Sequence, residues 1–216
     1  MNAIQTTGKT NGNEVNSIKI GMKLSDSLVS GRYTNKLVFS IFTNNYNYTA
    51  VMIKGTDFNT KLKSLETATN KIEHFKKSAV APAASVNAIN IEDEESDCEI
   101  KLWLDPTGKT AYYYTEAEKV RLNKDARSMF SGMSSLTTLD LSSFDTSRVT
   151  SMRFMFSGMS NLTTLNLSSF DTSQVTDMYA MFQGMSNLAI LDLSSFNTSK
   201  VTNMESMFSG MSNLAT

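Results

Sequence analysis

Residues 149–174, VTSMRFMFSGMSNLTTLNLSSFDTSQ, contain a pattern that recurs along the chain with a constant step of 26 residues. Its Met-Phe pair occurs four times at that step, at residues 129–130, 155–156, 181–182 and 207–208. Self-similarity at a fixed period of this length is the signature of a repeat architecture. The sequence therefore predicts stacked repeats over residues 126–216, with three complete units and a truncated fourth.

Each unit divides into two parts. The first part, as in Leu136-Thr-Thr-Leu139-Asp-Leu141, has the leucine spacing of leucine-rich repeats and the alternation of a short strand. In the second part, residues 149–159, apolar residues fall at three- and four-residue steps, which is typical of a helix that Gly158 would end. We predict an α/β fold: a short leucine-rich-type solenoid with parallel strands on one face and short helices on the other.

The composition changes upstream of the repeats. We expect a disordered N-terminus over residues 1–15 and a partial, sandwich-like β-rich region over residues 16–56. A helical or irregular segment and a linker should follow over residues 57–98. Residues 99–125 read as a β-hairpin around the turn Asp105-Pro-Thr-Gly108. Because the end of a repeat array needs a cover, we expect this hairpin to cap the first repeat.

Charge and residue counts exclude several classes of function. The chain has 20 basic and 21 acidic residues, so it lacks the basic balance that nucleic-acid binding requires. Apolar residues never run for the roughly 18 positions of a membrane span, so we expect no membrane insertion. With Cys98 the single cysteine and His74 the single histidine, metal sites and histidine-based catalysis have few possible ligands. We therefore expect no cofactor, no metal, no catalytic residue and no enzymatic activity.

The candidate ligand-binding residues are the outward positions of the predicted strands, because solenoids use such faces for recognition. They are Thr138, Asp140 and Ser142 in the first unit, Thr164, Asn166 and Ser168 in the second, and Ile190, Asp192 and Ser194 in the third. The alternative is a solvated sheet face, with Thr and Ser present because they suit strands. Three rungs span only about 10 Å, so a full interface would also need further repeats or the edges.

Two other features have a structural interpretation. The Met and Phe stripe could be an adaptable binding surface, but its recurrence at the same positions in each unit favours repeat core. The turn carboxylates Asp145 and Asp171 could bind calcium. However, Asn197 stands at the third such position, so we favour tight turns closed by these side chains.

The repeat pattern V-T-x-M-x-x-M-F-x-G-M-S-x-L-x-x-L-x-L-S-x-F-x-T-S resembles that of the BspA-like leucine-rich repeat surface proteins of bacteria. Residues 103–114 and 122–130 are also similar to the lead-in of that family, so the resemblance covers about residues 99–216. It implies an extracellular or cell-surface location, although the chain shows neither a signal peptide nor an anchor. It also implies a non-catalytic adhesin module that binds a host matrix protein, a cell-surface protein or a glycan.

Two alternatives to that function stay open. The repeats could be a structural spacer that projects another domain from the cell surface, and an enzyme is the least favoured class. In addition, the fourth unit lacks a following unit and exposes apolar positions such as Met207, Phe208 and Met211. We therefore expect end-to-end self-association or fraying at this unit.

Overall fold

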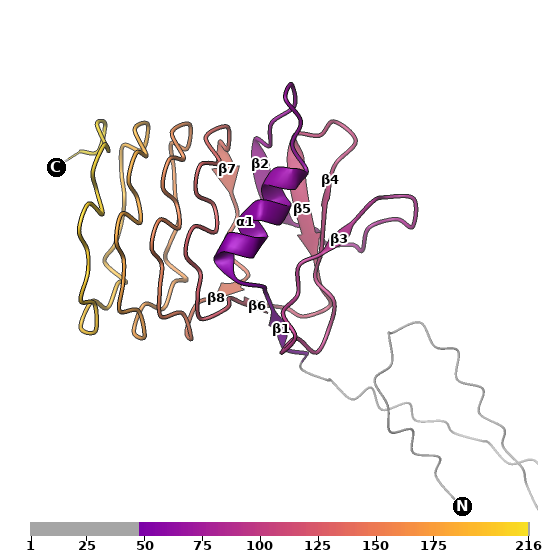
Figure 1. Cartoon of the computed structure of the whole chain (residues 1–216), viewed down its shortest axis with the longest axis horizontal. Coiled ribbons are helices and arrows are strands. Elements are labelled where there is room, and N and C mark those ends of the chain that lie inside the picture. Colours follow the sequence, from indigo (N-terminus) through magenta and orange to yellow (C-terminus); the bar gives the residue numbers. More distant parts are fainter. Residues whose placement is uncertain (1–47, 216) are drawn as a thin grey trace, which may run out of the picture. The chain divides into compact units, whose positions relative to one another are not determined.

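The computed structural model describes residues 48–215, so the predictions for residues 1–15 and for most of 16–56 lie outside the described part. The described chain is mixed α/β, with mostly short strands and few helical residues (Figure 1). Its elements are β1 (Ala50–Val51), α1 (Gly55–Ser64), β2 (His74–Lys77), β3 (Ile89–Asn90), β4 (Lys101–Leu104), β5 (Thr110–Tyr114), β6 (Val120–Arg121), β7 (Thr138–Leu139) and β8 (Phe144–Asp145).

The strands form two sheets at the N-terminal end of the repeats. The larger has the order β3-β4-β5-β2-β7, in which β4 and β5 are the predicted antiparallel hairpin. The hairpin does not cover the first repeat itself, because β2 lies between β5 and β7 and pairs with both in parallel. The carbonyl of Glu73 accepts from the Thr137 N–H at 2.8 Å, and that of Phe75 accepts from Asp140 at 3.0 Å. The smaller sheet, β1-β6-β8, is parallel throughout.

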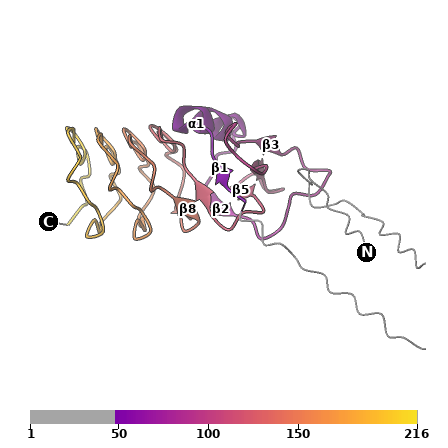
Figure 2. The same cartoon turned by 90° about the horizontal axis from the view of Figure 1, so that it is seen from below.

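Helix α1 completes the cover over the first unit. Figure 2 shows it lying along one side of the molecule, next to the first coil of the repeats. The Gly55 N–H donates to the Asp125 carbonyl at 2.9 Å, and the Asn59 side-chain amide donates to the carbonyls of Met129 (3.2 Å) and Ser131 (3.1 Å). A Cβ at Gly55 would lie 2.4 Å from the Arg127 carbonyl oxygen, so only glycine allows this approach. The cap is therefore composite, made by α1 and β2 as well as by the hairpin.

Residues 57–98 contain more regular structure than a helix and a linker. The helix ends at Ser64, and β2 and β3 follow. The acidic run at 92–95 is anchored, since the Glu92 carboxylate accepts from the Ile100 N–H and the Asp93 carboxylate from the Asn123 amide, both at 3.0 Å. Glu92 and Asp93 are therefore tied to neighbouring segments, whereas Glu94 and Glu95 are exposed.

The short helices predicted in the repeats are absent from residues 126–215, where the Met-Phe segments form successive turns. Each segment contains two residues with left-handed φ, which breaks the regular bond from N–H to the fourth preceding carbonyl. These residues are Ser128 and Gly132, Phe154 and Gly158, Ala180 and Gly184, and Ser206 and Gly210. The freed N–H groups donate to the next unit, as from Phe130 to Met155 (2.9 Å) and from Phe156 to Met181 (3.0 Å).

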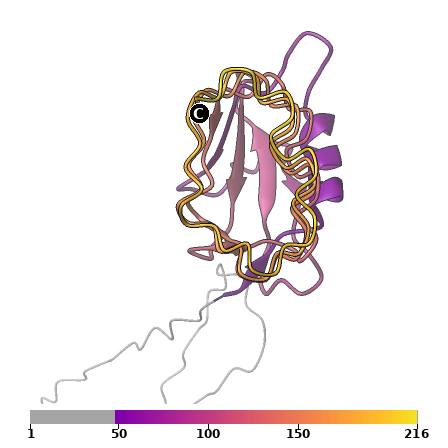
Figure 3. The same cartoon turned by 90° about the vertical axis from the view of Figure 1, so that its left-hand side faces the viewer.

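The predicted strands appear only in part. Strand β7 occupies the expected position in the first unit, but residues 164–165 and 190–191 at the same position are not strands. Single parallel bridges instead join the turn segments of successive units at Asp125, Ser151, Asp177 and Asn203. Seen end-on, the coils of these units nevertheless superpose closely (Figure 3).

The apolar stripe is the core, as predicted. Phe130, Phe156 and Phe182 are fully buried, and their rings stack with centroids 6.1 and 5.8 Å apart and nearly parallel planes. Thr146 is buried beside them, where its hydroxyl donates to the Asp171 carbonyl (2.9 Å) and accepts from the Asp171 N–H (2.8 Å). Thr172 repeats this arrangement one unit later, so each buried hydroxyl has its partners in the following unit.

Candidate functional site

A groove runs across β2 and three successive units of the repeat, and we call it the repeat groove. Its volume is about 730 Å³. Its lining residues are Phe75 and Lys76 from β2, Thr138, Leu139 and Asp140 from the first unit, Thr163, Thr164, Leu165 and Asn166 from the second, and Ala189, Ile190 and Asp192 from the third. Segments more than 100 residues apart in the chain therefore share one surface.

The groove contains six of the nine candidate residues from the sequence: Thr138, Asp140, Thr164, Asn166, Ile190 and Asp192. Ser168 and Ser194 lie beside it, in a smaller hollow of about 80 Å³ that Asn166 and Asp192 also line. Ser142 is exposed and lines neither space. The outward positions of the three units are thus neighbours, even though two of the three units form no strand there.

Each carboxylate or amide at the groove closes a local turn. Oδ1 of Asp140 accepts from the Ser142 N–H at 3.0 Å, and Asn166 and Asp192 do the same for the serines two residues later, at 3.0 and 2.9 Å. The Ser142 hydroxyl also donates to Oδ1 of Asp140, at 2.7 Å. Hydrogen bonds from the N–H and the hydroxyl of Ser194 lower the pKa of Asp192, so this carboxylate is ionised at neutral pH.

The same kind of hydrogen bond, from the N–H group two residues later, explains the Asp and Asn side chains of the other turns. Oδ1 of Asp145, Asp171 and Asn197 accepts from the N–H two residues later, at 3.0, 2.9 and 3.0 Å. The interpretation of these side chains as turn formers is confirmed. Within the described residues, no group of three or more Asp, Glu, His or Cys side chains could hold a metal ion.

Apolar side chains form part of the groove lining. Ile190 stands where the first two units have Thr138 and Thr164, and its side chain is 77% exposed. Leu139 and Leu165 lie on the neighbouring positions and are mostly buried. The groove therefore combines an exposed aliphatic side chain, three threonines and two carboxylates, with the single ammonium of Lys76 at the β2 end.

Sequence reasoning missed the β2 side of the groove. The carbonyls of Glu73 and Phe75 receive N–H groups of the first unit, and His74 Nδ1 lies 2.8 Å from the Thr138 hydroxyl, 64 residues away. Four residues with one clearly apolar side chain carry little periodic signal, so the position of β2 could not be predicted.

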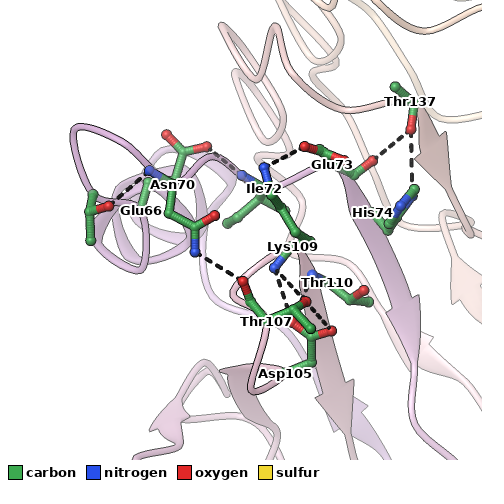
Figure 4. Close-up of polar contacts among 11 residues, drawn as sticks. Glu66, Asn70, Ile72, Glu73, His74, Asp105, Thr107, Lys109, Thr110 and Thr137 are labelled. Atoms are coloured by element: carbon green, nitrogen blue, oxygen red, sulfur yellow. Dashed lines mark hydrogen bonds and ion pairs between the residues drawn. The ribbon is translucent and has the colours of Figure 1, made fainter.

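A polar network holds the start of β2 in place (Figure 4). The Asp105 carboxylate accepts from the Thr107 hydroxyl at 2.8 Å and from the N–H groups of Lys109 and Thr110 at 3.0 and 3.1 Å. Lys109 reaches across to the Glu73 carboxylate, with 2.5 Å between Nζ and Oε1. This hydrogen bond is the main cause of the lowered pKa of Glu73. The network fixes β2 to the hairpin turn, and so fixes Phe75 and Lys76 at the groove.

The His74 ring pairs with the Thr138 hydroxyl and, more loosely at 3.5 Å, with that of Thr137. No carboxylate of the described chain accepts a hydrogen bond from this ring. The described residues therefore do not form a catalytic triad of nucleophile, base and orienting acid at His74. The chain also contains, in residues 48–215, no helix long and apolar enough to cross a membrane.

A family model described as "Mycoplasma protein of unknown function, DUF285" matches residues 124–216. That family is associated with BspA-like surface repeat proteins. The match covers the repeats and stops where the capping elements begin. No curated protein and no solved structure matches the chain.

Proposed function

We propose that this chain is a non-catalytic binding module of a bacterial cell-surface or secreted adhesin, and that the repeat groove holds its ligand, a host protein or a glycan. The observation that carries the proposal is that six outward residues from three units line a single groove with β2. Ligand sites are concave, largely apolar and contain a few well-placed polar groups, and their volumes run from about 300 to 1,000 Å³. The repeat groove has this composition and lies in this range.

The same proposal extends to the architecture and the location. We infer that the units form a leucine-rich-type solenoid in which turns replace the usual helices. The hydrogen bonds in register between units and the stacked phenylalanines support this inference. The family match supports an extracellular or surface location, because BspA-like proteins are surface repeat proteins.

A matched pair of variants tests the binding role. Asn166→Lys places an ammonium in the groove, whereas Asn187→Lys makes the same change at an exposed position outside it. Both variants and the parent would be applied to an array of host matrix proteins and glycans, after circular dichroism shows that all three are folded. We expect the parent and Asn187→Lys to capture the same ligand and Asn166→Lys to lose it.

The spacer alternative draws on one specific observation, that all three polar residues at positions 140, 166 and 192 already close local turns. It predicts that the two lysine variants behave identically on the array. Equal capture by both, or no capture by the parent, would favour the spacer over the binding module.

A further inference from the structure

The four units provide an internal comparison that singles out Phe154. The same position holds Ser128, Ala180 and Ser206 in the other units, and all four residues have φ between 52° and 59°. A bulky side chain in this left-handed region is a genuine outlier, and the other three units have Ser or Ala there. The ring of Phe154 is also not part of the buried core. The fold therefore does not require a phenylalanine here.

Phe154 belongs to a cluster of aromatic and charged side chains. Its ring centroid lies 5.1 Å from that of Tyr179 in the next unit, with the planes at 81°. The Arg153 guanidinium lies 4.8 Å from the Tyr179 ring centroid, and its Nη1 is 3.2 Å from the Asp177 carboxylate. Tyrosine and arginine dominate the residues that contribute most to protein interfaces. Side chains already held in place lose less freedom on binding.

The fourth unit does not repeat this pairing of a cation with a carboxylate. Glu205 occupies, in the fourth unit, the position of Arg153 and Tyr179 in the second and third. It is exposed and forms no ion pair with any residue from 48 to 215. Arg153 is held by an aromatic ring and a carboxylate together, on one side of Tyr179. One unit further on, the Ala180 N–H donates to the Glu205 carbonyl at 2.9 Å, so the exposed Glu205 continues the same row with a carboxylate that has no ion pair within residues 48–215.

We propose that Arg153, Phe154, Tyr179 and Glu205 form a second docking surface, which binds an arginine-bearing segment of a protein partner. The partner's guanidinium pairs with Glu205 and packs on the aromatic rings, as Arg153 does with Asp177 and Tyr179. Arginine fits better than lysine because its planar group stacks on rings and pairs with carboxylates in the same orientation. None of these four residues lines the repeat groove, so this surface is independent of the proposed function.

The test is an NMR titration of the isotope-labelled full chain with a blocked peptide that has one arginine between Leu-Pro flanks. The same peptide with citrulline in place of arginine is the uncharged control. We expect the arginine peptide to shift the amide signals of Tyr179 and Glu205 and the citrulline peptide to leave them unchanged. Glu205→Gln should weaken binding about fivefold, the loss of one exposed charge contact.

Phe154→Ser is the second variant, and it preserves the fold because serine occupies this position in two other units. It should abolish the shifts, whereas Asn166→Lys in the repeat groove should leave them intact. Absence of shifts, equal shifts with citrulline, or indifference to both Phe154→Ser and Glu205→Gln would overturn the proposal. Capture of a glycan that is lost in Phe154→Ser, without peptide binding, would also overturn it by assigning the surface to another class of ligand.

Discussion

The residues with left-handed φ set the shape of each unit. A non-glycine residue in this region costs about 1–2 kcal/mol, partly offset by the greater freedom of glycine in the unfolded chain. We therefore expect Ser128→Gly, at φ 59°, to raise the free energy of unfolding by about 0.5–1 kcal/mol. Ser131→Gly is the matched control at an ordinary φ and should lower it by about the same amount. Urea unfolding measures both, and changes of the same sign would contradict this account of the turns.

The turn carboxylates are a second set of residues that affect stability, and they make the free energy of unfolding depend on pH. Hydrogen bonds from the hydroxyl and the N–H of Ser173 lower the pKa of Asp171, so the folded state favours the ionised form. This stabilisation is fully present above the unfolded pKa of about 3.9 and is lost as the pH falls through the lower folded value. Asp171→Asn should retain the turn, as Asn197 does in the next unit, but should not titrate.

We therefore expect the free energy of unfolding of the parent to fall more steeply than that of Asp171→Asn below about pH 4. Chemical unfolding at a series of pH values from neutral to strongly acidic measures the difference. Parallel profiles for the two proteins would show that this carboxylate does not act as described.

At the scale of elements, α1 substitutes for a missing preceding unit. In later units, the carbonyls of Met155 and Ser157 accept from N–H groups of the unit before, whereas Met129 and Ser131 accept from the Asn59 amide. Removing this donor leaves two partly buried acceptors without a partner, at a cost of about 1–3 kcal/mol. Asn59→Ala should therefore destabilise the chain by this amount, while Thr60→Ala on the exposed side of α1 should change stability by less than about 0.5 kcal/mol. Thermal unfolding distinguishes them, and equal effects would rule out this capping role.

The elements also show what the sequence can and cannot predict. The 26-residue period, the buried Met-Phe stripe, the hairpin and the turn carboxylates follow from local patterns. Steps of three and four apolar residues, however, fit both a helix and a series of tight turns. The backbone angle φ decides between a helix and tight turns, and it is left-handed at Ser128, Phe154, Ala180 and Ser206. In the sequence, only the glycines four residues later indicate a left-handed conformation. Pairing of β2 with the first unit depends on contacts 64 residues apart, which no local pattern encodes.

On the scale of the whole molecule, end-to-end self-association stays a prediction. In the fourth unit, Met204 is 48% and Phe208 46% exposed. The N–H groups of Met204, Ser206 and Phe208 have no acceptor in the described chain, although their equivalents in the third unit donate to the fourth. We expect the sedimentation coefficient of the parent to rise with protein concentration and that of Met204→Glu to stay constant. Ile190→Glu, which changes an exposed side chain in the groove, should associate like the parent; concentration-independent sedimentation of the parent would contradict the prediction.

Whether the repeat groove holds the ligand can be measured by amide hydrogen exchange of the chain with and without the ligand captured on the array. We expect slower exchange at residues 138–140, 163–166 and 189–192 and at Phe75 and Lys76, the segments that line the groove. Exchange at the turn segments around residues 153 and 179 should not change. Protection confined to those turn segments, or to no segment of the groove, would contradict the account.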